Sequence, residues 1–589
     1  MIATRTFDYL DVIKTSFPNK EDVFAKYVNG QWLKYSIDNY IQASWNIASG
    51  LLAKGYQPED KVVVICNNCP EWNFLDMGCA LARLVFVPVY TTLSADETLF
   101  ALNHSDAKLI IVGNRSLYNK IIPIVDKMTR PAEVMTIDNC NCGYCFDDLI
   151  EYGKQNRNKF NPEIERNKKE ISPDNVATII YTSGTTGTSK GVMLTHRNLT
   201  FNSNSHAALQ TACSEHKMLS FLPLCHSYER TMSYEFQQLG ISVYYAENLS
   251  TIVRDLISFH GDGFCTVPRV LEMMYSKFES AGKNLKGLKR IIYKWAWHFG
   301  INYDNSRKGF IYSCKLRLAD QLVYSKWRSS LGGHILWIVC GGSAIRPNIV
   351  RLFTAAKLNV YQGYGMTEAS PVISVNPPAY NILGTNGLPL KNTELKFGDD
   401  GEILVRGPHI MKGYYKDEKA TNEIIDADGW LHTGDIGYLK DGLYLMITDR
   451  KKEIFKLSSG KYIAPQMIEN KLRESNYIEN CIVFGEHQKF ASAIILPNME
   501  ELRLWCNKND IQTDISAEEL LRNRRVVDLL NKEVSLINKS LSDYENIKKC
   551  IFSTDTWSVD NGMLSQTLKP KRANIFLKYK SAIDAIYNL

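Results

Sequence analysis

The chain has 589 residues, of which 45% are hydrophobic and 22% are charged, and its formal net charge is +6. These proportions are typical of globular proteins and exclude a disordered or fibrous chain. The length is enough for several hydrophobic cores, since it corresponds to about four units of ordinary domain size.

The sequence carries no sign of secretion or of a membrane-spanning helix. Its first residues, MIATRTFDYLDVIKTSF, lack a basic segment followed by an apolar run. The longest apolar candidate, residues 77 to 90, is interrupted by Arg83. We therefore expect a cytoplasmic protein.

Fourteen cysteines in such a chain indicate reduced thiols rather than a disulfide framework. Two clusters leave a structural zinc site as the alternative: Cys66 with Cys69, and Cys140 with Cys142 and Cys145. This alternative is disfavoured, because neither cluster has a nearby histidine and the first follows an apolar run typical of a core strand.

The N-terminal third alternates helices with short apolar strands. Ser36 is expected to cap a helix that ends at Gly55, and the capping-box sequence SADE at residues 94 to 97 opens another helix. A further helix is predicted at residues 71 to 83, and strands at residues 61 to 66, 85 to 89 and 108 to 112. This alternation indicates parallel sheets in an α/β architecture. The polar residues 151 to 175, which include two prolines, are predicted to form a surface connection.

The next segment, YTSGTTGTSKG at residues 181 to 191, contains three glycines, six serine or threonine residues and one lysine. Glycine lets backbone N–H groups approach an anion closely, and the hydroxyls and Lys190 add donors, so the segment is typical of a phosphate-binding loop. It is not a Walker A loop, because Ser189 precedes the lysine, Gly191 follows it, and apolar strand-like segments flank the loop.

Residues 281 to 330 are strongly basic, with eleven Lys or Arg against two Asp, a local net charge of +9. Trp295, Trp297 and Trp327 are interleaved with these charges, as on a surface that meets an anionic membrane. The alternative is a solvated helical insertion with its tryptophans packed underneath. Both interpretations stay open on the sequence.

The character of the chain changes again near residue 450. Short elements follow, including strand-like residues 481 to 484 and 493 to 496. They predict a separate α+β domain of about 140 residues.

Five motifs together resemble the adenylate-forming superfamily, which includes acyl-CoA synthetases, luciferases and peptide-synthetase adenylation domains. They occur in the family's order: YTSGTTGTSKG (181 to 191), YQGYGMTE (361 to 368), GWLHTGD (429 to 435), DRKKEIFKLSSGKYIAP (449 to 465) and LKPKR (568 to 572). LPLCHSYER (222 to 230), VPRVLEMMY (267 to 275) and the basic insertion narrow the resemblance to long-chain fatty-acid-CoA ligases.

The resemblance implies an α/β fold with a large N-terminal domain of layered mixed sheets and flanking helices, residues 1 to 449, carrying the insertion at 281 to 330. A small mobile α+β domain, residues 450 to 589, would rotate about a hinge near Lys452. The implied reaction joins a long-chain fatty acid to AMP from ATP, with Mg²⁺, and then transfers the acyl group to coenzyme A. Nucleic acid is not an expected partner. Peripheral contact with an anionic membrane, at its cytoplasmic face, remains one of the two interpretations of residues 281 to 330.

The implied nucleotide site spans several motifs. Residues expected at the β- and γ-phosphates are Thr182, Ser183, Gly184, Thr185, Thr186, Gly187 and Lys190. Tyr364, beside Gly365, resembles the residue that stacks on adenine, Thr367 the donor to the α-phosphate, and Glu368 the Mg²⁺ ligand. Asp435, assisted by Arg450, resembles the ribose-binding carboxylate, while Gly342 and Ser343 are expected to let backbone approach the adenosine.

The remaining expectations concern the acyl group and coenzyme A. Lys569 is expected to bridge the acyl carboxylate and the α-phosphate, although Pro570 departs from the superfamily pattern and leaves Lys571 as the alternative. His226 is expected beside the carboxylate, or else as a satisfied core histidine. Lys456 and Gly460 are expected on the side where coenzyme A reacts. Three other functions stay open: a ligase that delivers the acyl group to a carrier protein, a ligase for aryl or bile-type acids, and a catalytically inactive lipid- or nucleotide-binding homologue.

Overall fold

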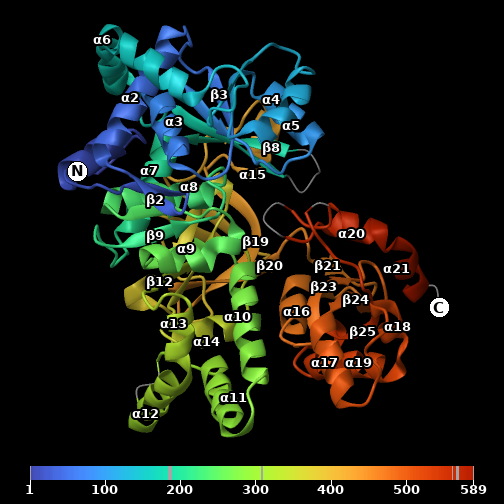
Figure 1. Cartoon of the computed structure of the whole chain (residues 1–589). Coiled ribbons are helices and arrows are strands. Elements are labelled where there is room, and N and C mark those ends of the chain that lie inside the picture. Colours follow the sequence, from blue (N-terminus) through green and yellow to red (C-terminus); the bar gives the residue numbers. More distant parts are fainter. Residues whose placement is uncertain (1, 184–188, 307–308, 560, 566–568, 588–589) are drawn as a thin grey trace.

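The computed structural model describes residues 2–183, 189–306, 309–559, 561–565 and 569–587. A seven-stranded sheet lies at the N-terminal end of the molecule (Figure 1), in the order β18-β8-β7-β4-β3-β5-β6. Its strands are β3 (Lys61–Ile65), β4 (Val85–Pro88), β5 (Ala107–Val112), β6 (Glu133–Thr136), β7 (Val176–Ser183), β8 (Ser189–Thr195) and β18 (Gly413–Tyr414). The strands from β7 to β6 are parallel, whereas β8 and β18 join antiparallel at one edge. The predicted parallel strands are thereby confirmed.

A nine-stranded sheet follows, in the order β15-β14-β13-β12-β11-β9-β10-β1-β2. Its strands are β1 (Phe24–Val28), β2 (Gln31–Tyr35), β9 (Lys217–Ser220), β10 (Ser242–Tyr245), β11 (Gly263–Thr266), β12 (Trp337–Cys340), β13 (Val360–Gly365), β14 (Val372–Val375) and β15 (Leu388–Pro389). The six central strands are parallel, and β2, β14 and β15 are antiparallel. The inner strands β9 to β12 are almost wholly buried, which is why they read as short apolar runs without alternation.

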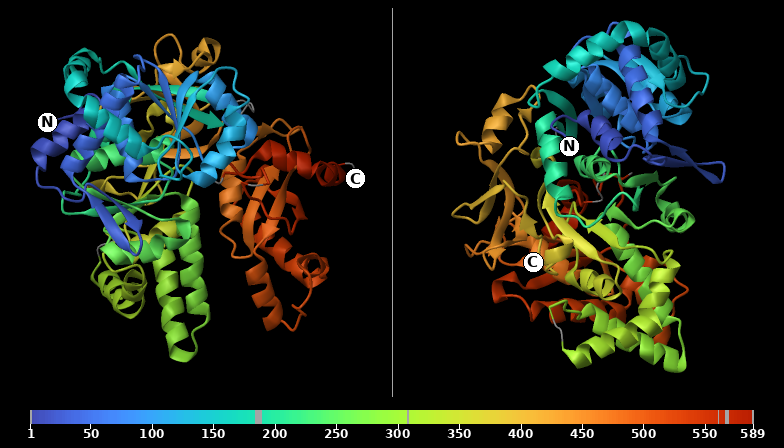
Figure 2. Two further views of the ribbon diagram at one scale, coloured as in Figure 1. Left: turned by 45° about the horizontal axis from the view of Figure 1, so that its top comes forward. Right: turned by 90° about the vertical axis from the view of Figure 1, so that its left-hand side faces the viewer.

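Helices cover these sheets (Figures 1 and 2). They are α1 (Asp8–Ser16), α2 (Ile37–Ala53), α3 (Pro70–Leu81), α4 (Ala95–His104), α5 (Arg115–Val125), α6 (Phe146–Glu170), α7 (His196–Ala207), α8 (Ser227–Leu239), α9 (Ile252–Phe259) and α14 (Pro347–Ala355). The two predicted helix starts are confirmed. Ser36 accepts a hydrogen bond from the Asn39 N–H at 3.2 Å, and Ser94 accepts one from the Glu97 N–H at 3.2 Å. Each partner side chain bonds back to the cap, so both starts are capping boxes.

The predicted surface connection at residues 151 to 175 is wrong, because α6 runs through residues 146 to 170 as one helix. Its few apolar side chains, such as Leu149 and Ile164, are buried, and the rest of its surface is polar. Gly153 lets its backbone touch α2: a Cβ at this position would lie 1.8 Å from the Asn46 carbonyl oxygen. Tertiary packing against α2 therefore stabilises a helix whose own sequence is too polar to indicate one.

Residues 281 to 330, named here the basic arm, are mainly helical where the structure describes them. The arm begins with the last turn of α10 (Pro268–Lys283). It continues with α11 (Gly287–Ile301), α12 (Phe310–Ala319), a π-helical turn (Asp320–Tyr324) and α13 (Ser325–Ser330). The tryptophans do not form its outer surface. Trp327 is buried and stacks on Phe278 at 4.8 Å between ring centroids, and Trp295 and Trp297 are half-buried against the same core. Of the two interpretations left open by the sequence, the placement of the tryptophans underneath a helical insertion is the one that agrees with the structure.

A four-stranded antiparallel sheet leads to the C-terminal part. It contains β16 (Glu394–Phe397), β17 (Glu402–Arg406), β19 (Leu431–Lys440) and β20 (Tyr444–Arg450), with α15 (Glu418–Ile424) beside it. After Arg450 the chain forms a hairpin of β21 (Phe455–Lys456) and β22 (Tyr462–Ile463), and a sheet of β23 (Ile478–Phe484), β24 (Ala491–Pro497) and β25 (Ile547–Phe552).

The C-terminal helices are α16 (Pro465–Leu472), α17 (Met499–Lys508), α18 (Ala517–Arg522), α19 (Arg524–Asn538), α20 (Arg572–Lys578) and α21 (Lys580–Tyr587). Figure 2 shows this smaller part beside the large one. The predicted fold class, large mixed sheets with flanking helices and a small α+β part, is confirmed. Within the described residues, no helix has both the length and the apolar character needed to cross a membrane.

Candidate active site

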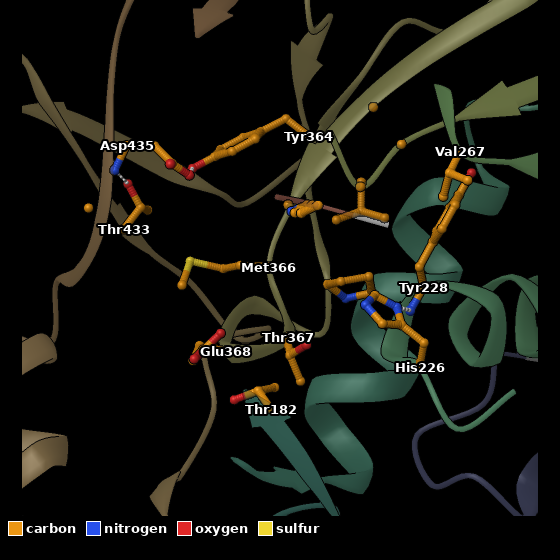
Figure 3. Close-up of a pocket in the computed structure, with 18 of the residues that line it drawn as sticks. Thr182, His226, Tyr228, Val267, Tyr364, Met366, Thr367, Glu368, Thr433 and Asp435 are labelled. Atoms are coloured by element: carbon orange, nitrogen blue, oxygen red, sulfur yellow. Dashed lines mark hydrogen bonds between the residues drawn. The ribbon is translucent and has the colours of Figure 1, made fainter. Parts of the chain in front are cut away.

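A cavity of about 890 Å³ is enclosed by segments far apart in the sequence. It is lined by the end of β13, the start of α8, the beginning of β19, the end of β20 with residues 451 to 453 that follow it, and Lys569 near the C-terminus. Figure 3 shows Asp435, Tyr364 and Thr433 on one side and His226, Tyr228 and Val267 on the other. Predicted site residues that line it are Thr182, Lys190, His226, Gly342, Tyr364, Gly365, Thr367, Glu368, Asp435, Arg450, Lys452 and Lys569.

Asp435 and Tyr364 form the first polar group in this cavity. The Tyr364 hydroxyl donates to Oδ2 of Asp435 at 2.7 Å, and Nε of Arg450 lies 3.2 Å from its Oδ1. Asp435 and Arg450 face each other as partners in the β19–β20 ladder, which fixes their spacing. Burial raises the pKa of Tyr364 well above its usual value, so the hydroxyl keeps its proton. The arrangement offers a fixed carboxylate and an aromatic ring.

Glycines keep the backbone close at this end of the cavity. At Gly365 a Cβ would lie 1.9 Å from the Pro371 carbonyl oxygen, so no side chain fits. Gly342 has φ +85°, which favours glycine. Ser343, which was grouped with Gly342, does not line the cavity among the described residues.

Lys190 and Glu368 form a second polar group. Thr182 and Lys190 pair across β7 and β8 at the mouth of the glycine-rich loop. The Lys190 ammonium lies 4.7 Å from the centroid of the Tyr414 ring, whose hydroxyl donates to Oε1 of Glu368 at 2.8 Å. Gly184, Thr185, Thr186 and Gly187 lie outside the described residues, as does the side chain of Ser183. A cation and a carboxylate therefore face one cavity beside the loop.

His226 stands at the N-terminus of α8. Its Nδ1 accepts a hydrogen bond from the Tyr228 N–H at 3.1 Å, so the ring proton belongs on Nε2. Burial, followed by repulsion from Lys569, lowers the pKa of His226 to about 4. The imidazole is therefore neutral at pH 7 and can donate from Nε2. Next to it, the Ser227 hydroxyl lies 3.2 Å from that of Thr367.

Lys569 reaches the cavity from a short loop of the C-terminal part. The Lys569 N–H donates to Oγ of Ser565 at 3.0 Å, the Ser565 N–H donates to the Lys569 carbonyl at 2.7 Å, and Pro570 bridges to Leu564. Burial, and after it the nearby Arg450, lower the pKa of Lys569 to about 8, although Asp435 and Glu453 act to raise it. Pro570 thus directly follows Lys569 and is held against Leu564, so it is compatible with the position of this lysine in the cavity.

Lys571 occupies a different place. It caps the N-terminus of α20, its N–H donates to the Met563 carbonyl at 2.8 Å, and it does not line the cavity among the described residues. The following Arg572 pairs with Glu453 at 3.0 Å and with Glu469 at 2.8 Å. These pairs tie the loop to the segment that joins the two parts of the chain.

That joining segment begins at Lys451, which pairs with Asp400 and Glu402 at 2.7 Å each. Lys452 is exposed and lines the cavity. Lys456 and Gly460, expected on the coenzyme A side, lie in the β21–β22 hairpin and do not line this cavity among the described residues.

The sequence did not predict the buried polar contacts of Arg230, which join the elements around the cavity. Arg230 is fully buried; its guanidinium contacts Oδ1 of Asp76 at 2.5 Å, the Thr178 hydroxyl at 2.6 Å and the Tyr234 hydroxyl at 2.9 Å. These contacts join α8 to α3 and to β7, the strand that ends at the glycine-rich loop. The available signal was a single acid, Asp76, inside the apolar helix sequence WNFLDMGCAL.

Comparisons with known proteins agree along the whole chain. Residues 15–415 match the family model for AMP-binding enzymes, and residues 452–589 match that for the C-terminal domain of AMP-binding enzymes. Human long-chain-fatty-acid-CoA ligase 1 is 31% identical over 95% of this chain and 82% of its own, and the FadD15 long-chain-fatty-acid-CoA ligase of Mycobacterium bovis is 30% identical over 96% and 94%. Bacillus subtilis o-succinylbenzoate CoA synthetase, solved with ATP and magnesium, has a TM-score of 0.64 at 20% identity over 93% and 96%.

Proposed function

This chain belongs to the AMP-binding enzymes, which form acyl-adenylates, and we propose that it is a long-chain fatty-acid-CoA ligase. The observation that carries the proposal is one cavity holding Lys569, Glu368 and Asp435 together with an apolar side. Apolar residues of that lining include Tyr90, Phe221, Met232, Val267, Val270, Val339 and Val375. The polar groups suit a nucleotide, and the apolar side suits a hydrocarbon chain.

In the first step a carboxylate oxygen of the fatty acid attacks the α-phosphorus of ATP, the bond to the β-phosphate oxygen breaks, and pyrophosphate leaves. Negative charge gathers on the α-phosphate, so fixed positive donors there lower the barrier. Lys569 is proposed to bridge the carboxylate and the α-phosphate, with Thr367 donating to the phosphate and Nε2 of His226 orienting the carboxylate. Lys190 and the glycine-rich loop would hold the departing phosphates.

The nucleotide would be held by the residues at the other end of the cavity. Asp435, which already accepts a hydrogen bond from Tyr364 and forms an ion pair with Arg450, is proposed to bind the ribose hydroxyls, with the Tyr364 ring against adenine. Glu368 presents a hard oxygen ligand that fits Mg²⁺, and the bound ion would neutralise charge on the phosphates. Gly342 and Gly365 line the cavity without a side chain, and they are proposed to let the backbone approach the adenosine.

In the second step the sulfur of coenzyme A attacks the acyl carbonyl carbon and AMP leaves with the bonding electrons. Lys456 and Gly460 are proposed to act here, after residues 450 to 589 rotate about Lys452 and carry Lys569 away. Gly460 has φ +85° in the β21–β22 turn. Such a rotation would account for the absence of these two residues from the cavity that Lys569 lines, among the described residues.

The substrate class is tested by pyrophosphate exchange with straight-chain acids of increasing length and with benzoate, followed by thioester formation on free coenzyme A. The proposal expects exchange to rise steeply with chain length, because each buried methylene contributes about 0.8 kcal/mol. Best exchange with benzoate would identify an aryl-acid ligase. Acyl-AMP that accumulates in the presence of coenzyme A would instead indicate a carrier-protein acceptor.

The pKa of Lys569 gives a pH prediction for the first step. A lysine that must be charged to hold two anions is active below its pKa, so kcat/KM for ATP in the exchange assay should fall as pH rises through about 8. Lys569→Arg should move this fall upward by at least about one pH unit, since a guanidinium stays charged. The same profile in both proteins would show that another group titrates.

A second prediction concerns the joining segment. Proline fixes φ near −65° and restricts the preceding residue, so Lys452→Pro should hinder rotation. We expect thioester formation to slow by about tenfold or more while pyrophosphate exchange changes by less than about threefold. Lys452→Ala is the matched control, because it removes the charge without restricting the backbone. Lys440→Pro is unsuitable as a control, because Lys440 lies in β19 and the proline would break the strand ladder. Unchanged thioester kinetics in Lys452→Pro would remove the reason for placing the hinge there.

A further inference from the structure

The basic arm projects from the body of the large part. Figures 1 and 2 show α11 and α12 at the end of the molecule opposite α2 and α6. The inner side of the arm is packed: Ala296, Ala319, Val323 and Tyr324 belong to a core shared with α10 and α14. Its outer side is solvent-facing, and the side chains there are of two kinds.

The first kind is cationic. Of the two acids in the arm, Asp320 is already paired with Arg328 at 2.5 Å and with Lys357 at 2.7 Å. Seven basic residues of the arm form no ion pair with any acid that the structure describes: Lys286, Lys289, Arg290, Lys294, Lys315, Arg317 and Lys326. Since the chain carries +6 and the arm +9, all other residues together carry −3. The positive charge of the protein is therefore concentrated here.

The second kind is apolar and exposed. Leu288 and Ile291 lie in the first turns of α11, and Phe310 and Ile311 begin α12. Between 66% and 84% of each of these side chains is exposed to solvent. Leu318 and Leu322 continue an exposed apolar line along α12 and the π-helical turn. Soluble surfaces rarely combine large apolar side chains with uncompensated lysines in this way.

We propose that the outer side of the basic arm docks on an anionic lipid bilayer, with Leu288, Ile291, Phe310 and Ile311 inserted at the headgroup level. Lysine and arginine around exposed Leu, Ile and Phe are the composition of helices that lie in a membrane interface. A second copy of the chain is a poorer partner, because it would place +9 against +9. A nucleic acid would use the charges but would leave the four apolar side chains in water.

Helix α10 connects the cavity to the basic arm. Val267 and Val270, at the start of this helix, line the cavity, and its other end leads into the arm. Sixteen residues of helix span about 24 Å. A docked arm would hold the cavity near the bilayer, into which a long-chain acid partitions. Only this last point rests on the proposed substrate; the docking itself does not, and it can be measured without ATP or fatty acid.

The test is cosedimentation of the full-length protein with vesicles of phosphatidylcholine alone and with 30% phosphatidylglycerol. We expect binding to the anionic vesicles that weakens between 0.05 and 0.5 M salt, and little binding to the neutral ones. The triple variant Lys286→Gln/Lys289→Gln/Lys294→Gln should bind about 100-fold more weakly, at roughly fivefold per charge. A matched control removes three exposed lysines from α6, at the opposite end: Lys154→Gln/Lys159→Gln/Lys169→Gln should bind like the unchanged protein.

The apolar contribution is tested separately with Leu288→Ser/Phe310→Ser. This variant should lose at least about tenfold in binding at 0.5 M salt, where the charges are screened, and should keep its circular dichroism and pyrophosphate exchange. Binding that is equal in the arm and α6 variants would overturn the proposal. The proposal would also be overturned if Leu288→Ser/Phe310→Ser changed the protein from a dimer to a monomer in light scattering and still bound vesicles. That result would assign the apolar side chains to contact between two copies of the chain.

Discussion

Lys569→Ala is expected to lower the rate of acyl-AMP formation by about 10²- to 10³-fold, as loss of a donor aimed at developing phosphate charge does in other enzymes. Supplied acyl-AMP should still react with coenzyme A at a rate within roughly threefold of normal, because that step is assigned to another arrangement of the two parts. Pyrophosphate exchange measures the first step, and thioester release from synthetic acyl-AMP measures the second.

Lys571→Ala is the matched control, since it removes a lysine two residues away that caps α20 and does not line the cavity among the described residues. We expect it to retain exchange within about threefold. If Lys571→Ala is the variant that loses exchange, or if Lys569→Ala loses both steps equally, the assignment of Lys569 to adenylation is contradicted.

Arg230→Met is expected to lower the free energy of unfolding by about 3 kcal/mol or more, because it leaves Asp76 buried without its partner. Burial already raises the pKa of Asp76, so the acid can take up a proton in the variant, and the cost should lie toward the low end of the range for broken buried pairs. Urea unfolding followed by tryptophan fluorescence measures the change.

The control is the exposed pair of Arg197 with Asp174, at 2.6 Å. Arg197→Met should cost less than about 1 kcal/mol, because solvent screens that pair. Asp76→Leu combined with Arg230→Met should be less destabilising than the two single changes added together, since the double variant buries no unpaired charge. Equal costs for Arg230→Met and Arg197→Met would contradict the supporting role of Arg230.

Some of the fold could be predicted because the signals are local. The helix starts at Ser36 and Ser94 need only a side chain and its partner three residues later, and both are present. The buried strands are short apolar runs, and the strand–loop–strand reading of residues 176 to 195 follows from its composition. Such signals do not depend on how distant segments pack.

Other features could not be predicted, because they depend on tertiary contacts. The sequence of α6 is polar, and this helix is stabilised by packing against α2, where Gly153 allows close contact between the two backbones. Composition also left the placement of the tryptophans of the basic arm open, because it does not show which side of a helix meets a core. Trp327 packs inside, and the exposed side carries Leu288, Ile291 and Phe310 instead.

The candidate site was predicted mainly from its motifs. The structure adds that Lys569, rather than Lys571, reaches the cavity, and that the Nδ1 bond from Tyr228 leaves the His226 proton on Nε2. Tyr414, which links Lys190 to Glu368, was not anticipated, because it comes from β18 and follows no phosphate-binding pattern. The buried contact of Arg230 with Asp76 joins residues 154 positions apart, a distance over which one sequence gives no pairing signal.

The central claim is most directly tested by separating the nucleotides formed when the purified protein is mixed with Mg-ATP and oleate, with and without coenzyme A. The proposed ligase predicts AMP and pyrophosphate, and oleoyl-CoA only when coenzyme A is present. ADP as the product, or AMP formation that never yields oleoyl-CoA with coenzyme A present, would contradict a long-chain fatty-acid-CoA ligase.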